Sequence, residues 1–324
     1  MRHSELTAIH GCDVKVSKLS LGTAPLGGLF KKVAESESDS VIREALDAGI
    51  AYIDTAPLYG YGVGEIRVGR GIKGHANQPA ISTKVGRLLR PGKNTEHDKF
   101  PDSDPNIEIY FDHSAAGIRR SLEESLQRLG RESIEIVYIH DADNWVADAI
   151  NVVYPELHKM REEGLLKAIG IGMNWCPTSI SIMKDTDLNI ALIAGRFTLL
   201  DQSAQQELYP LALKKKVSII AAGVFNSGVL ANPVDGAHYD YEPASQEILT
   251  KARAIGKYLE RYDVSLPDAA LQFPLRHPAV ASVLTGAGSI SELRANIKSF
   301  DTELPVQLWS DMEEADLIAP INLK

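Results

Sequence analysis

Residues 51–64 read AYIDTAPLYGYGVG, and this stretch decides the fold class. Its first five residues form a short apolar run that carries the charged Asp54 near its end, and Pro57 breaks the pattern soon afterwards. A short, continuous apolar run bounded by turn residues is typical of a strand that is buried on both faces, as in a parallel sheet. We therefore expect residues 51–55 to form one strand of a parallel sheet, with Asp54 at its carboxyl end.

Similar runs recur along the whole chain, and amphipathic segments of helical period lie between them. The predicted strands cover residues 18–23, 51–55, 80–84, 134–140, 168–173, 190–194, 218–224 and 281–285. The helices predicted between them include residues 36–48, 114–129, 154–163 and 205–216. Strict alternation of strands and helices predicts a (β/α)8 TIM barrel. A doubly wound sheet is the alternative, because strand order cannot be read from the sequence.

Three segments exceed a minimal barrel. Residues 1–17 read as a hairpin, residues 90–113 as a long loop rich in Pro, Asp and Lys, and residues 245–262 as a helix additional to 267–276. Long loops in compact domains are often functional, so we expect residues 90–112 to form a mobile cover over the barrel mouth. The fold class is thus α/β, one barrel domain across residues 1–324 with an N-terminal hairpin and extra C-terminal helices.

The composition excludes several function classes. The chain has 324 residues and a net charge of −9, which disfavours a protein that binds nucleic acid through clustered Lys and Arg. No apolar run approaches the roughly 20 residues of a membrane span, and the N-terminus has no signal-peptide core. Cys12 and Cys176 are too few for a disulfide framework. We expect a cytoplasmic protein without nucleic-acid or membrane partners, and the oligomeric state stays open.

Polar residues end three consecutive predicted strands. Asp54, Lys84 and His140 lie at the carboxyl ends of the second, third and fourth strands, and Tyr59 follows Asp54 by one short turn. Each residue alone has an ordinary structural explanation, such as a helix cap or a packed ring. The carboxyl ends of barrel strands surround the active site in characterised enzymes of this fold. The combination therefore predicts a catalytic site.

The chemistry that these four groups suggest is proton transfer to or from an alcohol or carbonyl. A free tyrosine, with a pKa of about 10, is a poor base at neutral pH. A nearby Lys84 cation favours the phenolate, and Asp54 holds that cation in place. His140 donates a hydrogen bond to the substrate oxygen. None of these groups supplies hydride, so a redox reaction requires a cofactor.

Small residues after the last two strands predict where a cofactor phosphate binds. Gly286 and Gly288 lie between the last strand and a helix, and Asn226, Ser227 and Gly228 follow the seventh strand. Barrels often bind phosphate in these loops, at a helix N-terminus. A metal site has little support, because His140 and Asp141 would face opposite sides of a strand. We predict no metal.

Five stretches together resemble the aldo-keto reductase family. They are AYIDTAPLYGYGVGEIRVGRGI (51–72), ISTKVGRLLRP (81–91), SLEESLQRLG (121–130), IEIVYIHDAD (134–143) and VLTGAGSISELRANI (283–297). The resemblance covers nearly the whole chain and is strongest to the aldose 1-dehydrogenase branch, which includes fucose, galactose and pyridoxal dehydrogenases. It implies a catalytic tetrad at Asp54, Tyr59, Lys84 and His140.

The same resemblance implies the cofactor contacts. Asn174 would hold the nicotinamide carboxamide and Asn296 the adenine, while Met173 and Ala194 replace the usual Ser and Gln. Relatives that prefer NADP grip its 2′-phosphate with Lys and Arg at positions that here read Gly286 and Glu292. A carboxylate repels a phosphate and accepts hydrogen bonds from a ribose hydroxyl. The sequence therefore predicts that NAD is preferred over NADP.

These observations lead to one main hypothesis and two alternatives. The chain is expected to oxidise a small-molecule aldose of the L-fucose, D-threo-aldose or L-galactose type at its anomeric carbon, giving the lactone. The first alternative is a pyridoxal 4-dehydrogenase or general aldehyde reductase of the same fold. The second is a regulatory subunit that binds the cofactor without turnover. The candidate substrate-pocket residues are Phe30, Leu58, Trp145 and Trp175.

Overall fold

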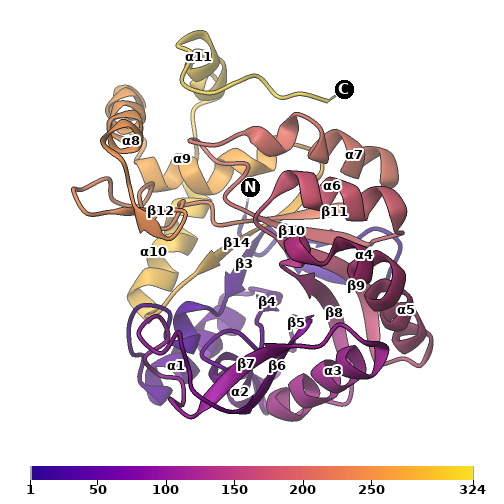
Figure 1. Cartoon of the computed structure of the whole chain (residues 1–324). Coiled ribbons are helices and arrows are strands. Elements are labelled where there is room, and N and C mark those ends of the chain that lie inside the picture. The colour runs from indigo at the N-terminus through magenta and orange to yellow at the C-terminus, as the bar shows by residue number, and fades with distance from the viewer. Residues whose placement is uncertain (1, 324) are drawn as a thin grey trace.

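The computed structural model describes residues 2–323, and within that range eight parallel strands close into a barrel. Figure 1 shows the strands around the centre and helices outside them. The strands are β3 (Leu19–Gly22), β4 (Tyr52–Asp54), β5 (Ala80–Val85), β8 (Ile134–His140), β9 (Leu166–Met173), β10 (Ile190–Ala194), β11 (Ser218–Ala222) and β14 (Val280–Gly286). They pair in chain order, and β14 closes the ring on β3. The predicted TIM barrel is confirmed, and the doubly wound alternative is wrong.

The helices follow the strands as the alternation predicts. They are α1 (Glu35–Asp47), α2 (Val63–Ile72), α3 (Ala115–Leu129), α4 (Val146–Asp148), α5 (Tyr154–Glu162), α6 (Cys176–Asp185), α7 (Leu208–Lys215), α8 (Gln246–Leu259), α9 (Leu266–Gln272), α10 (Ile290–Asp301) and α11 (Leu308–Glu314). In α3 the Ser114 hydroxyl accepts a hydrogen bond from the Gly117 amide, and Gly130 ends the helix with φ +65°. Both features are the expected caps. By contrast, α1 begins after Ala34 without a side-chain cap.

The N-terminal hairpin closes one end of the barrel. Its strands β1 (Leu6–Ala8) and β2 (Lys15–Ser17) pair antiparallel, as predicted. Ile9, Val14 and Val16 join the cluster inside the barrel, with side chains from the amino-terminal parts of several strands. Because this end is filled with apolar side chains, only the opposite, carboxyl-terminal end is open for chemistry.

The segment predicted as a long loop is an ordered hairpin instead. β6 (Arg87–Pro91) and β7 (Ile107–Phe111) pair antiparallel along their whole length, and both lie beside the mouth of the barrel near β5 in Figure 1. The sequence of β7, IEIYF, consists mainly of β-branched and aromatic residues, which favour strands. Most of the prolines and acidic residues that suggested a loop belong to the connection between the two strands, while Pro91 ends β6 and Glu108 lies in β7.

A buried ion pair anchors that connection to the barrel. The Arg67 guanidinium of α2 lies 2.9 Å from the Asp102 carboxylate, and the two side chains are only 8% and 11% exposed. Arg67 also donates to the carbonyl groups of Leu26 and Val33, and the Val33 amide donates to Asp102. The tip of the hairpin is therefore tied to the segment that follows β3.

Two further segments complete the fold. After β11 the chain forms the short pair β12 (His238–Tyr239) and β13 (Glu242–Pro243) and then α8. The Ser245 hydroxyl caps α8 by accepting a hydrogen bond from the Ile248 amide, so the predicted additional helix is confirmed. In the described part of the chain, no helix is long and apolar enough to cross a membrane.

Candidate active site

Adjacent strands bring the predicted polar residues to one place. Asp54, Lys84 and His140 lie at or near the carboxyl ends of β4, β5 and β8, which are neighbours in the barrel. Their exposed fractions are 1%, 2% and 6%. Tyr59 lies in the turn between β4 and α2 and is partly exposed. A carboxylate and an ammonium group that are this deeply buried require partners, and each supplies one for the other.

Lys84 is the centre of the arrangement. Its Nζ lies 2.7 and 2.9 Å from the two carboxylate oxygens of Asp54, 2.9 Å from the Thr55 carbonyl oxygen and 3.1 Å from the Tyr59 hydroxyl. The same atom lies 4.6 Å from the centre of the Tyr59 ring. The ammonium group thus fixes the phenol oxygen, and Asp54 fixes the ammonium group.

Asp54 is held in turn by a chain of hydroxyl groups inside the barrel. The Ser82 hydroxyl donates to Asp54 Oδ1 at 2.6 Å, and the Tyr52 hydroxyl lies 2.8 Å from Ser82 Oγ. The Tyr138 hydroxyl lies 2.9 Å from that of Tyr52. Ser82, Tyr52 and Tyr138 are fully buried. Fully satisfied buried networks fix side-chain positions, so the carboxylate is placed by rigid strands.

The Tyr59 hydroxyl is protonated in this environment. Burial raises its pKa well above the ordinary value of 10, the Asp54 carboxylate raises the pKa further, and the Arg87 guanidinium opposes the rise. The sequence led us to expect that Lys84 lowers this pKa. Desolvation of the phenolate is the larger effect, because a buried anion loses its hydration.

His140 is neutral. Burial lowers its pKa well below 6.5, and the Arg87 and Lys84 cations lower it further. Within residues 2–323 its buried Nδ1 atom has no hydrogen-bond partner, and its Nε2 atom lies 3.4 Å from Asp141 Oδ2. A neutral imidazole has one donor and one acceptor nitrogen, so the ring has capacity for a substrate oxygen.

Asp141 does not face away from His140, as strand alternation had suggested. β8 ends at His140, and Asp141 adopts a left-handed conformation with φ +46°. This turn brings its carboxylate back toward the imidazole and to 2.8 Å from the Arg87 guanidinium. The sequence interpretation missed both Arg87 and Asp141, because the period of a strand does not extend beyond its last residue.

The residues expected to hold the adenine end of a cofactor gather at the start of α10. Glu292 accepts a hydrogen bond from the Gly288 amide at 2.7 Å. The Asn296 side chain donates to Thr285 Oγ1 and to the Gly286 carbonyl at 3.3 and 3.2 Å. The region thus joins backbone donors, an amide and an exposed carboxylate at the end of β14.

The second expected set follows β11. Asn226, Ser227 and Gly228 all have positive φ angles, of +45°, +60° and +107°. The Ser227 hydroxyl accepts a hydrogen bond from the Tyr241 amide. Asn226 is buried, and among the described residues nothing bonds its Oδ1 atom. A buried amide oxygen without a partner costs free energy, so this turn retains capacity for a ligand.

Arg196 connects this turn to Asn174, the residue expected at the nicotinamide. Its guanidinium donates to the Asn174 carbonyl oxygen at 2.8 Å and pairs with Asp201 and Asp240 at 2.9 and 2.6 Å. It also lies 5.2 Å from the centre of the Trp175 ring. Nothing in the sequence pattern marked Arg196, since its two carboxylate partners are five and 44 positions away.

The four candidate pocket residues occupy different surroundings. Phe30 stacks on His238, with ring centres 6.1 Å apart, and is more than half exposed. Trp175 is exposed beneath Arg196, and Leu58 is partly buried beside Tyr59 in the chain. Trp145 stacks closely on His113, with centres 3.8 Å apart. Trp145 follows Asp141 by four residues. Of the four candidates, only Leu58 is closer along the chain to a residue of the tetrad.

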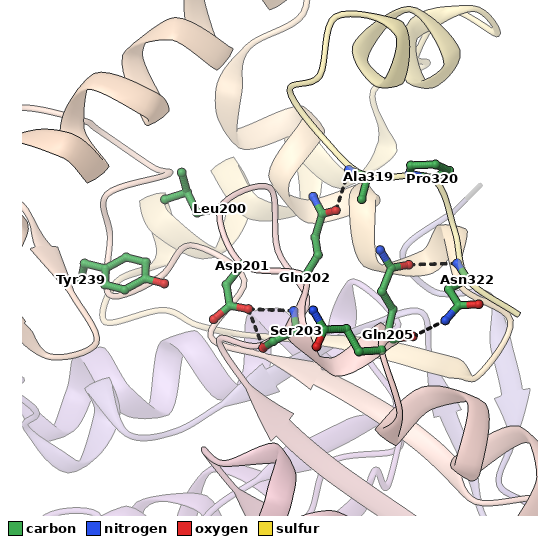
Figure 2. Close-up of a pocket in the computed structure, with 10 residues that line it drawn as sticks. Leu200, Asp201, Gln202, Ser203, Gln205, Tyr239, Ala319, Pro320 and Asn322 are labelled. Atoms are coloured by element: carbon green, nitrogen blue, oxygen red, sulfur yellow. Dashed lines mark hydrogen bonds between the residues drawn. The ribbon is translucent and has the colours of Figure 1, made fainter. Parts of the chain in front are cut away.

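A surface hollow of about 590 Å³ lies near Arg196 rather than at the tetrad. Figure 2 shows Gln202 and Gln205 reaching from its wall to the C-terminal segment, where they accept hydrogen bonds from the Ala319 and Asn322 amides. Asp201 on the same wall accepts from Ser203 and also pairs with Arg196. Gln202 and Gln205 thus anchor the C-terminal segment to the part of the chain that follows β10.

Comparison with known proteins agrees with this architecture. A model of the Aldo/keto reductase family matches residues 18–317. A D-threo-aldose 1-dehydrogenase from a Pseudomonas species is 37% identical over 96% of this chain and 97% of its own length. A pyridoxal 4-dehydrogenase from Microbacterium luteolum is 36% identical over 98% and 99% of the two chains.

Structural similarity extends over the same range. The holo form of an aldo-keto reductase from Bacillus halodurans superposes with a TM-score of 0.80, at 25% identity, over 98% of this chain and 97% of the other. Aldo-keto reductases use NAD(P)H, and the dehydrogenases named above support an oxidoreductase enzyme here. The chain belongs to the aldo/keto reductase family.

Proposed function

We propose that this oxidoreductase is an NAD-dependent aldose 1-dehydrogenase, which oxidises the cyclic hemiacetal of an aldose to its lactone. The observation that carries the proposal is the 3.1 Å contact between Lys84 Nζ and the Tyr59 hydroxyl at the open end of the barrel. The similarity to a D-threo-aldose 1-dehydrogenase over almost the full length of both chains supports the substrate class.

The proton transfer is assigned to Tyr59. The anomeric hydroxyl of the sugar loses its proton to the Tyr59 oxygen in the phenolate form, while the neutral His140 ring donates a hydrogen bond to the same substrate oxygen. Lys84 stabilises the phenolate, and Asp54 holds the Lys84 ammonium group in place at 2.7 Å. A bound nicotinamide ring would supply the acceptor for the hydride that leaves the anomeric carbon. Loss of this proton and hydride converts the hemiacetal to the lactone.

The residues present fit such a cofactor. The loop around Gly286 and Gly288 at the start of α10, where the Gly288 amide donates to Glu292 in this structure, and the positive-φ turn of Asn226, Ser227 and Gly228 would hold its phosphates. The unbonded Asn226 oxygen is a polar group that a ligand would satisfy. Asn174, at the end of β9 and tied to Arg196, would hold the nicotinamide amide.

We further propose that NAD is preferred because of Glu292. Its carboxylate lies exposed at the start of α10 and opposes a 2′-phosphate, which carries about −2 charge at neutral pH. Arg294 does not compensate, because it pairs with Glu44 of α1 at 2.7 Å. Glu292→Arg should shift the ratio of catalytic efficiencies toward NADP, and a wild-type preference for NADP would contradict the proposal.

A cofactor-reduction screen tests the substrate class. L-fucose, D- and L-galactose, D-arabinose and pyridoxal are compared at equal concentrations with NAD, and absorbance of the reduced cofactor is followed. We expect turnover of at least one aldose with higher kcat/KM than pyridoxal. Turnover of pyridoxal alone would favour the first alternative, and cofactor binding without turnover of any substrate would favour a regulatory subunit.

A further inference from the structure

An ion pair borders the tetrad on the side of β8 and has no part in the proton transfer described above. The Arg87 guanidinium and the Asp141 carboxylate are 2.8 Å apart, and their side chains are 19% and 25% exposed. Asp141 Oδ2 is also 3.4 Å from His140 Nε2. Asp141 is the next residue in the chain after His140, whose ring is assigned to the substrate oxygen. Arg87 is paired with Asp141, so a cation and an anion both lie beside this ring.

Several polar atoms around this pair lack partners. In the described part of the chain, the buried Arg87 Nε, His113 Nε2, Asp143 Oδ1 and Trp145 Nε1 atoms make no hydrogen bond. Ring contacts link three of these residues: Arg87 lies 5.1 Å from the centre of the Phe111 ring, the Phe111 and His113 ring centres are 5.9 Å apart, and His113 stacks on Trp145. Native proteins leave few buried polar atoms unsatisfied, so such a group of them indicates a place where a polar ligand binds.

We propose that Arg87 and Asp141 bind the hydroxyl group on the carbon next to the one that is oxidised, so that the enzyme selects substrates with a vicinal diol. This inference rests on the proposed function. The two oxygens of a vicinal diol lie about a hydrogen-bond length apart. If the anomeric oxygen bonds to Tyr59 and His140, the adjacent hydroxyl reaches the Asp141 carboxylate, which is in contact with His140.

The chemistry of the pair suits a hydroxyl group better than other functions. A hydroxyl donates one hydrogen bond and accepts others, so it donates to Asp141 and accepts from Arg87 at the same time. A substrate without that hydroxyl leaves the Arg87 Nε atom of this partly buried pair without a hydrogen-bond partner. Sites built to bond a substrate hydroxyl discriminate strongly against analogues that lack it.

The test compares one sugar with its 2-deoxy counterpart, D-galactose with 2-deoxy-D-galactose, or the matching pair for whichever aldose turns over best. For wild type we expect kcat/KM to be roughly 10- to 100-fold higher for the 2-hydroxy sugar, the range for a hydrogen bond to a charged group. In Asp141→Asn and Arg87→Met this ratio should fall to within about threefold of one, because the deoxy sugar loses much less. Asn tolerates the left-handed backbone that Asp141 adopts.

A matched control is Arg119→Gln. Arg119 pairs with Glu156 and Glu163 on the outside of the barrel, so the ratio should keep its wild-type value. An unchanged ratio in both site variants, with turnover of aldoses intact, overturns the role of the pair but not the proposed function. Absence of turnover with both sugars in wild type overturns the proposed function and this inference together. If Asp141→Asn does not fold by circular dichroism, Arg87→Lys and Arg87→Met decide the matter.

Discussion

At the scale of single residues, two opposing effects act on the Tyr59 hydroxyl, which is bonded to a cation and partly removed from water. Lys84 favours the charged phenolate, whereas burial favours the neutral phenol, and the pKa of Tyr59 shows that burial is the larger effect. The neutral phenol is ready to donate a proton to a carbonyl. In the oxidation direction the same group must first lose its proton, which has a direct consequence for pH dependence.

Removing the Tyr59 hydroxyl tests its role most directly. Tyr59→Phe keeps the ring beside Lys84 and removes the oxygen that transfers the proton. We expect kcat to fall about 100-fold or more, the scale of general acid–base catalysis, with cofactor affinity nearly unchanged. Steady-state kinetics and a cofactor titration measure the two quantities. Retention of most wild-type activity would remove Tyr59 from the mechanism.

The raised pKa of Tyr59 predicts the pH profile of oxidation. Below this pKa the phenolate fraction grows about tenfold for each pH unit, so kcat for sugar oxidation should rise through neutral and alkaline pH without a plateau. His140 is neutral throughout, because its pKa is lowered well below 6.5, and should add no step near that value. A profile from pH 6 to 10 checks both points. Lys84→Met should move the rise to higher pH, and an active variant with the wild-type profile would refute the coupling.

The sequence predicted the residues of the tetrad but not those beside it. Asp54, Lys84 and His140 end apolar strands, and that position alone specifies where their side chains meet once the barrel closes. Asp141 could not be placed, because its left-handed conformation follows the strand and depends on the local turn. Arg87 was missed because it begins β6, a strand that was not predicted from the sequence.

At the scale of elements, the hairpin of β6 and β7 depends on an ion pair that no sequence pattern reveals. Asp102 in its connection and Arg67 in α2 are far apart in the chain and meet only in the folded structure. Regular strands and helices were predictable from periodicity, since each buries a face whose pattern is local. The position of the hairpin connection could not be predicted from the sequence, because one long-range contact determines it.

This contact predicts a specific loss of stability. Asp102→Ala leaves the buried Arg67 cation without its carboxylate, and breaking a buried pair in this way typically costs about 3–5 kcal/mol. Urea unfolding measures the change in the free energy of unfolding. The control is Glu108→Ala, whose partner Arg90 is more than half exposed, and a surface pair of this kind contributes about 1 kcal/mol or less. Equal losses in the two variants would contradict the anchoring role.

At the scale of the whole molecule, the two ends of the barrel differ: apolar packing fills one end, and the residues proposed for binding and catalysis lie at the other. The N-terminal hairpin and the apolar cluster fill one end, while the residues proposed to act on substrate or cofactor lie on turns, on strand ends and in α10. The cofactor residues come from the ends of β9, β11 and β14 and from α10, which are far apart in the chain. A ligand that binds all of them therefore links distant segments of the folded state and has no equivalent site in the unfolded chain.

Such a ligand must raise the stability of the whole fold in proportion to its affinity. At 100 times its dissociation constant a ligand stabilises the native state by about 2.7 kcal/mol, which corresponds to a rise of a few degrees in Tm. Because Glu292 opposes a 2′-phosphate, we expect NAD to raise Tm more than NADP at equal concentration. Thermal melting of wild type and Tyr59→Phe should show the same shifts, since the Phe variant retains the cofactor residues. Glu292→Arg should reverse the order of the two cofactors. A larger shift with NADP in wild type would show that the carboxylate does not govern the choice, whatever the rates of turnover.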